Sequence, residues 1–110
     1  MTDSEQVEIQ IETAKSMIAM RDALNKLYKN RQFKVVIEQG YFKDEAARLV
    51  MAKSNSALSE ENQKFIDNMI TGVGALANYF EMIARRGAEM EQVLEDSETA
   101  QQEMLVEELN

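Results

Sequence analysis

Any chemistry in this sequence would have to come from carboxylates, lysines and arginines, because the chain contains neither histidine nor cysteine. The metal ligands and the nucleophile–base pairs of most enzymes are therefore absent. Carboxylate-bridged di-iron bundles are helical, but they rely on Glu-x-x-His pairs. The Gly-Val-Gly stretch at residues 72–74 has neither the preceding strand nor the lysine of a phosphate-binding loop. We expect a protein that is not an enzyme and has no cofactor or metal.

Carboxylates alone could pair as in a glycosidase, but nothing in a short helical chain predicts an enclosed sugar site. Basic side chains gather at Lys26, Lys29, Arg31 and Lys34, where two joined helices would resemble a DNA-binding layout. The formal net charge is nevertheless −8, and basic contacts to phosphate supply most non-specific affinity for nucleic acid. The sequence therefore disfavours direct binding to nucleic acid.

The charges are divided unevenly along the chain. Residues 21–53 hold eight basic residues against four carboxylates, whereas the last thirty residues hold Arg85 and Arg86 against nine carboxylates. This distribution could pair copies head to tail or attract a basic partner to the acidic end. The simpler alternative is that the charges lie on solvated helix faces and keep the protein soluble.

Length and composition predict one all-α domain. A chain of 110 residues buries only about two thirds of its unfolded surface, so its stability could lean on a partner. No proline interrupts the helices, and no apolar run is long enough to cross a membrane. The absence of cysteine and of a secretory leader leads us to expect a reducing, intracellular setting.

The elements expected in the first half are a helical hairpin with a corner. A long helix should run from Thr2 or Asp3 to about Asn30, with apolar residues at steps of three and four. Short helices are predicted over residues 31–39 and 43–54. Gly40, between them, should end the first of these with a positive φ, and Tyr41 and Phe42 should fill the resulting corner as core anchors.

The most regular pattern lies in the second half. Ser59 is a suitable N-cap for a long helix that reaches about residue 96. Its apolar positions, here called the heptad seam, alternate at steps of three and four: Ile66, Met69, Val73, Leu76, Phe80, Ile83, Gly87, Met90 and Leu94. This spacing indicates lengthwise packing against another helix.

Two arrangements could satisfy the heptad seam. The first helix could pair antiparallel with part of it while another copy covers the rest, or the long helix could break at Gly72 and Gly74. Each glycine inside a helix costs about 1 kcal/mol relative to alanine, so each needs either a bend or the close approach of a neighbouring helix. Gly87, on the seam itself, favours close approach and a continuous helix.

The chain should therefore form a single helical domain over residues 1–96, followed by an acidic flexible tail over residues 97–110. The start of this tail has no apolar seam. Its end gathers a small apolar cluster of Met104, Leu105, Val106 and Leu109. The cluster could be a docking peptide or the end of the helix resuming contact.

Two stretches, FKVVIEQGYFKDEAARLV and IDNMITGVGALANYFEMIARRG, resemble a group of small acidic helical proteins of tailed bacteriophages. The resemblance covers about residues 11–95. Within the second stretch the matching residues are Ile70, Gly74, Ala75, Leu76, Tyr79 and Phe80. It implies a phage origin and a place among virion or assembly components, and it supplies no catalytic or ligand-binding residues.

We therefore expect a small structural or assembly component of a tailed-phage particle. It would form homo-oligomers through the seam residues Ile66, Met69, Val73, Leu76, Phe80, Ile83, Met90 and Leu94, and it would contact other virion proteins. The alternative is an acidic regulatory protein that binds and inhibits a host enzyme, with the C-terminal cluster as anchor. Either protein would act in the virion or the host cytoplasm.

Overall fold

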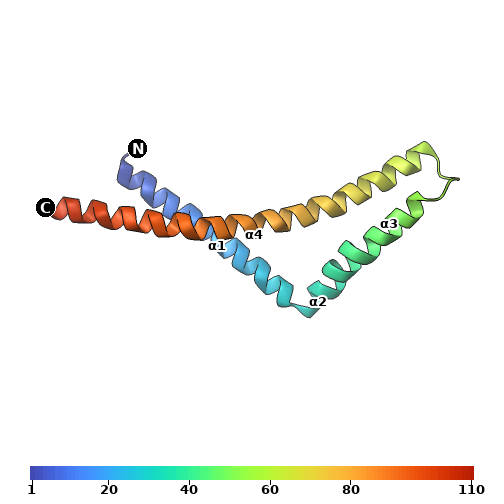
Figure 1. Ribbon diagram of the computed structural model, residues 1–110, viewed down its shortest axis with the longest axis horizontal. Coiled ribbons are helices and arrows are strands. Elements are labelled where there is room, and N and C mark those ends of the chain that lie inside the picture. Colours follow the sequence, from blue (N-terminus) through green and yellow to red (C-terminus); the bar gives the residue numbers. More distant parts are fainter. The chain divides into compact units, whose positions relative to one another are not determined.

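The computed structural model describes all 110 residues and contains helices but no strands. The elements in chain order are α1 (Asp3–Lys29), α2 (Arg31–Phe33), the π-helical η1 (Lys34–Glu45), α3 (Ala46–Lys53) and α4 (Glu60–Leu109) (Figure 1). The predicted all-α fold, with a long N-terminal and a long C-terminal helix, is confirmed. No helix combines the length and the hydropathy that crossing a membrane requires.

Polar side chains cap three of the helices, and Ser59 does so at the position that the sequence predicts. The hydroxyl of Thr2 accepts a hydrogen bond from the backbone N–H of Glu5 at 3.1 Å, and the hydroxyl of Ser59 accepts one from the N–H of Asn62 at 3.2 Å. Asn30 separates α1 from α2, and its side-chain oxygen accepts the N–H of Phe33 at 2.9 Å. Each cap satisfies a donor that the first turn of a helix leaves unpaired.

The chain divides into two compact units. Unit 1 comprises Met1–Asn25 and Met82–Asn110, and unit 2 comprises Lys26–Glu81. Helix α4 contributes its last part to unit 1 and its first part to unit 2. The division therefore falls inside the predicted 1–96 domain, and no break in secondary structure occurs at residue 96.

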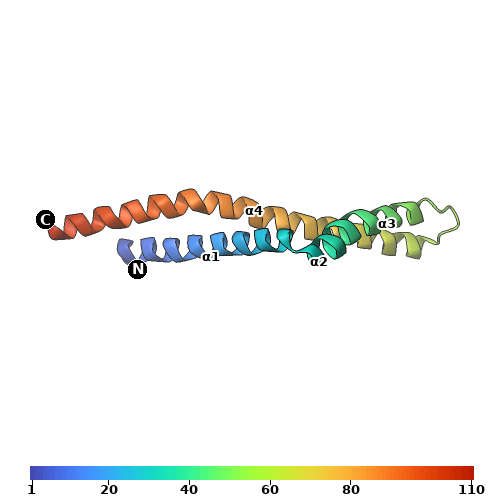
Figure 2. The ribbon, with the colours of Figure 1, turned by 90° about the horizontal axis from the view of Figure 1, so that it is seen from below.

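In unit 1, α1 and the last part of α4 run in opposite directions (Figure 2) and cross each other (Figure 1). Two polar contacts fix their register: Arg21 Nη2 bonds Glu91 Oε1 at 2.7 Å, and the Ser97 hydroxyl bonds Gln10 Oε1 at 3.4 Å. The buried apolar residues of this unit are Ile11, Ala14, Leu24 and Ile83. These side chains form a narrow line between two helices.

Gly87 marks the closest approach of these two helices. A Cβ atom built on Gly87 would lie 2.4 Å from the Cβ atom of Arg21, a separation that real Cβ atoms do not reach. Glycine is therefore required at this seam position for the backbones to come so close. The close approach that the sequence predicts at Gly87 is confirmed.

In unit 2, α2, η1 and α3 follow one another without a break and pack against the first part of α4. Leu49 of α3, 1% exposed, and Val73 of α4, 8% exposed, are its buried apolar residues. Lys53 Nζ lies 2.8 Å from Asp67 Oδ1 and joins the end of α3 to α4. Unit 2 is thus a second antiparallel helical pair, closed by the loop of residues 54–59.

The predicted corner at Gly40, Tyr41 and Phe42 is wrong. No glycine in the chain has a positive φ, and all three residues lie inside η1. A Cβ atom on Gly40 would meet the carbonyl oxygen of Val35, five residues earlier, at 2.9 Å. The wider π-helical turn therefore accounts for glycine here, where the sequence suggested a helix end.

Helix α4 passes without interruption through Gly72 and Gly74, so the continuous helix that the sequence favours is confirmed and the alternative break does not occur. A Cβ atom on Gly72 would lie 3.8 Å from the Tyr41 hydroxyl, an ordinary contact, and one on Gly74 would meet nothing within 4 Å. Neither glycine is therefore required by packing inside the chain.

The acidic tail differs from the expectation. Residues 97–110 do not begin a structureless link, because α4 continues to Leu109. Ser97 is 6% exposed, and Met104 is half-buried. The heptad seam continues at steps of three and four through Ser97, Ala100 and Met104. Ser97 and Ala100 are small, and Met104 lies four residues further on, so these positions do not form a recognisable apolar run in the sequence.

Substitution by alanine should have opposite effects on stability at Gly87, which packs against α1, and at Gly74, which faces open space. We expect Gly87→Ala to lower the free energy of unfolding by about 1 kcal/mol or more, because the added methyl collides with Arg21. Gly74→Ala is the matched control and should raise it by about 1 kcal/mol, because its methyl enters open space in a helix. Urea unfolding measures both; a Gly87→Ala protein as stable as the Gly74→Ala protein would contradict the close approach.

Removal of residues 97–110 should loosen the start of α1, which loses Ser97 and Met104 as packing partners. A loss of about 1.5 kcal/mol makes amide exchange in the first turns of α1 about tenfold faster. Hydrogen-exchange mass spectrometry measures this rate. Leu109→Ala, at a residue 87% exposed, should leave it unchanged, and an unchanged rate in the truncated chain would mean that the tail is a free appendage.

Candidate interaction surfaces

The heptad seam faces the chain's own helices. Val73 and Ile83 are each 8% exposed, Gly87 is buried, and the other six seam residues are half-buried. In unit 2 the seam packs against the segment Arg31–Lys53, and in unit 1 it packs against α1. The positions predicted as an interface between copies therefore form the core within one chain.

An aromatic cluster surrounds Phe80 in unit 2. The ring of Phe80 lies 5.8 Å from Phe42, 5.9 Å from Phe33, 6.1 Å from Tyr79 and 6.3 Å from Tyr28, measured between centroids. Tyr28 and Phe42 meet it edge to face. Such aromatic pairs contribute about 0.5–1.5 kcal/mol each beyond the area that they bury.

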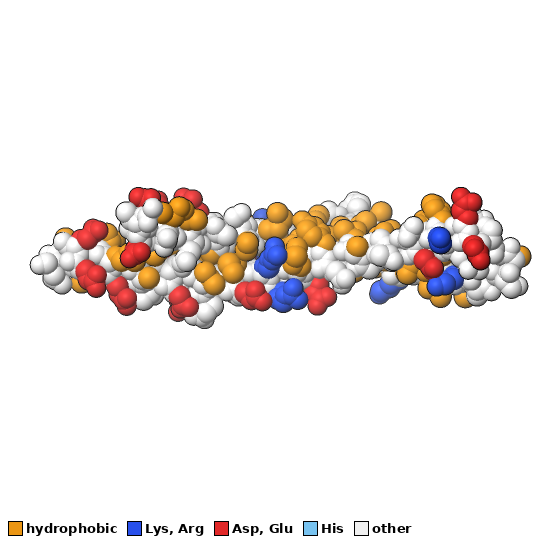
Figure 3. Space-filling model, turned by 90° about the horizontal axis from the view of Figure 1, so that it is seen from above, with side chains coloured by type: hydrophobic (Ala, Val, Ile, Leu, Met, Phe, Trp, Pro, Cys, Tyr) orange, Lys and Arg blue, Asp and Glu red, His pale blue; other side chains and the backbone are white.

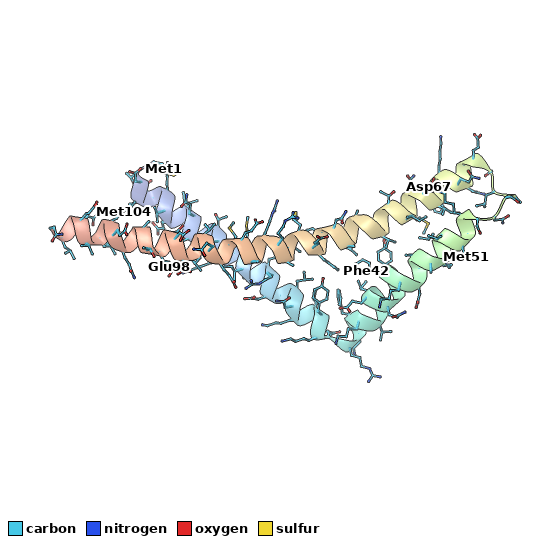
Figure 4. The ribbon with its side chains drawn as sticks, in the orientation of Figure 1. Met1, Phe42, Met51, Asp67, Glu98 and Met104 are labelled. Atoms are coloured by element: carbon cyan, nitrogen blue, oxygen red, sulfur yellow. The ribbon has the colours of Figure 1, made fainter.

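Phe80 thus joins three stretches of chain at a single point. Phe42 points from η1 toward α4 (Figure 4), so this predicted corner anchor holds a helix pair together in the absence of a corner. Burial raises the pKa of the Tyr28 phenol above its ordinary value, and the Glu38 carboxylate adds to this shift. The spacing of apolar residues predicts Phe80 on the heptad seam. It does not predict that Tyr28 and Phe33 contact Phe80, because these two residues belong to other helices.

The C-terminal apolar cluster is split by the helix. Met104 lies on the inner side, beside residues 2–4 at the N-terminal end of the chain, whereas Leu105, Val106 and Leu109 are 55%, 57% and 87% exposed. Helical geometry separates these four neighbours, because residues one position apart point about 100° away from each other. Three of the four side chains therefore remain accessible to a partner.

Charge separates the two units sharply. Unit 1 holds thirteen carboxylates and four basic residues, a formal charge of −9, while unit 2 holds seven and eight, a formal charge of +1. Carboxylates are prominent at the end that carries both termini, which belongs to unit 1 (Figure 3). Unit 1 is therefore repelled by another copy of itself and attracted to a basic surface.

Ion pairs account for only a few of these charges. Arg21 lies 18% exposed between Asp22 and Glu91, and its hydrogen bond to Glu91, followed by the one to Asp22, raises the pKa of its guanidinium. In unit 2, the hydrogen bond from Arg48 lowers the pKa of the Glu45 carboxyl. The basic residues Lys26, Lys29, Arg31 and Lys34 make no ion pair within 4 Å.

Shallow grooves lie on both units. One lies between α1 and α4 in unit 1, lined by Ile9, Thr13, Met90 and Val93. Another lies on η1 in unit 2, lined by Val36, Ile37, Gly40, Tyr41 and Glu45. No three metal-ligating side chains come together.

Comparison with family models, with curated proteins and with solved structures gives no match to this chain.

Phe80 should be the most sensitive position of unit 2. We expect Phe80→Ala to lower the free energy of unfolding by about 3 kcal/mol, because four aromatic neighbours lose their common contact. Met51→Ala, at a residue 72% exposed, is the control and should change it by less than about 0.5 kcal/mol. Thermal and urea unfolding followed by circular dichroism test this, and equal effects of the two substitutions would show that the cluster is not a core.

Proposed function

We propose that this chain is a small non-enzymatic structural or assembly component of a tailed-phage particle, and that it works by oligomerising through its helical surfaces. The phage origin rests on the resemblance of residues 11–95 to small acidic helical phage proteins. Its partners would be further copies and other virion proteins, in the virion or the host cytoplasm. The observation that supports self-association is the amount of surface that the chain leaves exposed.

The accessible surface of the single chain is 8271 Å². A folded monomer of 12.6 kDa has about 6,200 Å² by the usual scaling with mass, so this chain exposes about 2,100 Å² more than expected. Obligate homodimers bury about 1,000–2,500 Å² on each protomer. The surplus therefore matches the surface that one protomer gives up in such a contact.

Part of the exposed surface is apolar, as a contact between copies requires. The exposed apolar side chains of unit 2 are Leu27, Val35, Val36, Val50, Met51, Phe65 and Tyr79, each between 45% and 72% exposed. Burying one such side chain contributes about 1.5–3 kcal/mol. The residues of the heptad seam already pack against other helices of the same chain. The contact between copies would therefore involve these outer faces of the helices.

A second candidate function is favoured by the charge of unit 1. An acidic helical pair with a formal charge of −9 fits a regulatory protein that binds a basic surface on a host enzyme and inhibits it, with Leu105, Val106 and Leu109 as an apolar anchor. Such a protein needs no second copy of itself. The oligomeric state therefore separates the two candidates.

Light scattering coupled to size-exclusion chromatography, over a wide range of protein concentration, tests the proposal. We expect a stable multimer whose mass does not fall between about 0.1 M and 1 M salt, because at 1 M the Debye length is only about 3 Å and ionic contacts are screened. A chain that remains monomeric at every concentration would contradict the proposal and favour the regulatory candidate.

A further inference from the structure

A second line of residues follows the heptad seam along α4, one position before it. This line, called the outer seam, comprises Phe65, Asn68, Gly72, Ala75 and Tyr79 and also repeats at steps of three and four. All five residues are exposed, with Phe65 64% and Tyr79 48% exposed. Their spacing places them on one face of the helix, and none of them carries a charge.

The groove on η1 adjoins the outer seam. Tyr41 lines this groove together with Val36 and Gly40, and its hydroxyl lies 3.8 Å from the point where a Cβ atom on Gly72 would stand. The outer seam and the groove therefore form one surface on the same side of unit 2. Val36, 62% exposed, adds a third large apolar side chain to Phe65 and Tyr79.

Gly72 lies at the centre of the outer seam, seven residues from Phe65 and seven from Tyr79. Contacts inside the chain do not require glycine here, although glycine costs about 1 kcal/mol relative to alanine within a helix. A second helix that crosses at Gly72 would make use of the missing side chain, as α1 does at Gly87, where the Arg21 Cβ atom approaches. Two aromatic side chains equally distant from that crossing suit an antiparallel partner of the same sequence.

The formal charges of the two units favour a contact between copies through unit 2 over one through unit 1. Unit 2 has a formal charge of +1, whereas unit 1 has −9. Two copies of unit 2 can therefore meet without net repulsion, while two copies of unit 1 cannot. Antiparallel α4 helices also place their dipoles in opposition, which is the favourable arrangement.

We propose that the outer seam and the η1 groove form the contact surface for a second copy of this chain, with two α4 helices crossing antiparallel at Gly72 about a two-fold axis. Phe65 of each copy then packs beside Tyr79 of the other, and the same patch serves both copies. This inference rests on the proposed self-association and names the surface that carries it.

Cysteine cross-linking tests the crossing point directly, because the natural chain has no cysteine. Gly72→Cys is compared with Gly74→Cys, a matched control two residues away whose new side chain enters open space. A disulfide requires Cα atoms within about 7 Å. Under mild oxidation at a concentration where the natural chain is dimeric, we expect Gly72→Cys to form the covalent dimer about tenfold faster or more, as measured by mass spectrometry.

A second variant tests the same surface without a change at Gly72, in case cysteine at that position itself weakens the dimer. Phe65→Glu, at an exposed position, should raise the dissociation constant of the dimer about thirtyfold, the size of a hot-spot loss. Leu109→Glu, at an apolar residue of unit 1 that is 87% exposed, is the control and should leave the dissociation constant unchanged, and circular dichroism checks that both variants keep their helices.

The outcomes separate this surface from the proposed function. A multimer that survives Phe65→Glu and cross-links equally fast through Gly72→Cys and Gly74→Cys would overturn the outer seam as the contact while leaving self-association in place. A natural chain that is monomeric at every concentration would overturn both, and would assign the outer seam to a foreign partner.

Discussion

The packing of one long helix against two successive partners within its own chain is the constraint on which the rest of the structure depends. Helix α4 presents apolar and small residues at steps of three and four from Ile66 to Met104. The early part of this line packs against the segment Arg31–Lys53 and the later part against α1. Because each residue turns a helix by about 100°, one inserted residue would rotate every later position out of contact. The register must therefore hold through Gly72 and Gly74, even though both weaken the helix.

This arrangement leaves little interior. In a pair of helices each residue has only one neighbouring element, and Leu49 is the one large side chain that is almost completely enclosed. Unit 1 gains contact by bringing its backbones close at small residues, namely Ala14, Gly87 and Ser97, and unit 2 gains it from the rings around Phe80. Both solutions give tight contact along a line and leave the outer helix faces in water. The chain therefore has more accessible surface than a compact monomer of its mass.

The parts of the fold that were predicted correctly depend on local or periodic signals. The cap at Ser59 acts within three residues, and the heptad seam repeats often enough to identify its helix. The wrong predictions have a common cause. A glycine at position 40 is compatible with the end of a helix and also with a π-helix in which a side chain would crowd the Val35 carbonyl. The residue type alone therefore cannot distinguish these two geometries. The prediction of a flexible tail was wrong because Ser97 and Ala100 continue the heptad seam. Their small side chains allow the helices to pack closely, and a hydropathy pattern does not reveal this effect of size.

The interaction surface was harder to predict than the core. The outer seam stands one residue away from the heptad seam, so the sequence presents a single broad apolar stripe from Phe65 to Phe80. Only burial divides it into residues that hold the chain together and residues that remain exposed. The aromatic cluster needed the same information, because Tyr28, Phe33 and Phe42 reach Phe80 from different helices.

Charge and apolar surface lie on different units, and this separation gives each unit a different capacity for contact. A surface of five uncharged residues in a unit of formal charge +1 favours association that salt does not weaken, whereas a unit of formal charge −9 repels its equivalent in another copy at low salt. Repulsion between the acidic units opposes growth beyond a pair joined through unit 2. Such a pair would carry two identical acidic units, and a basic partner with two sites could bind both with an avidity above that of either site alone. In such a pair, the negative charge that disfavours contact between the acidic units would also bind the basic partner.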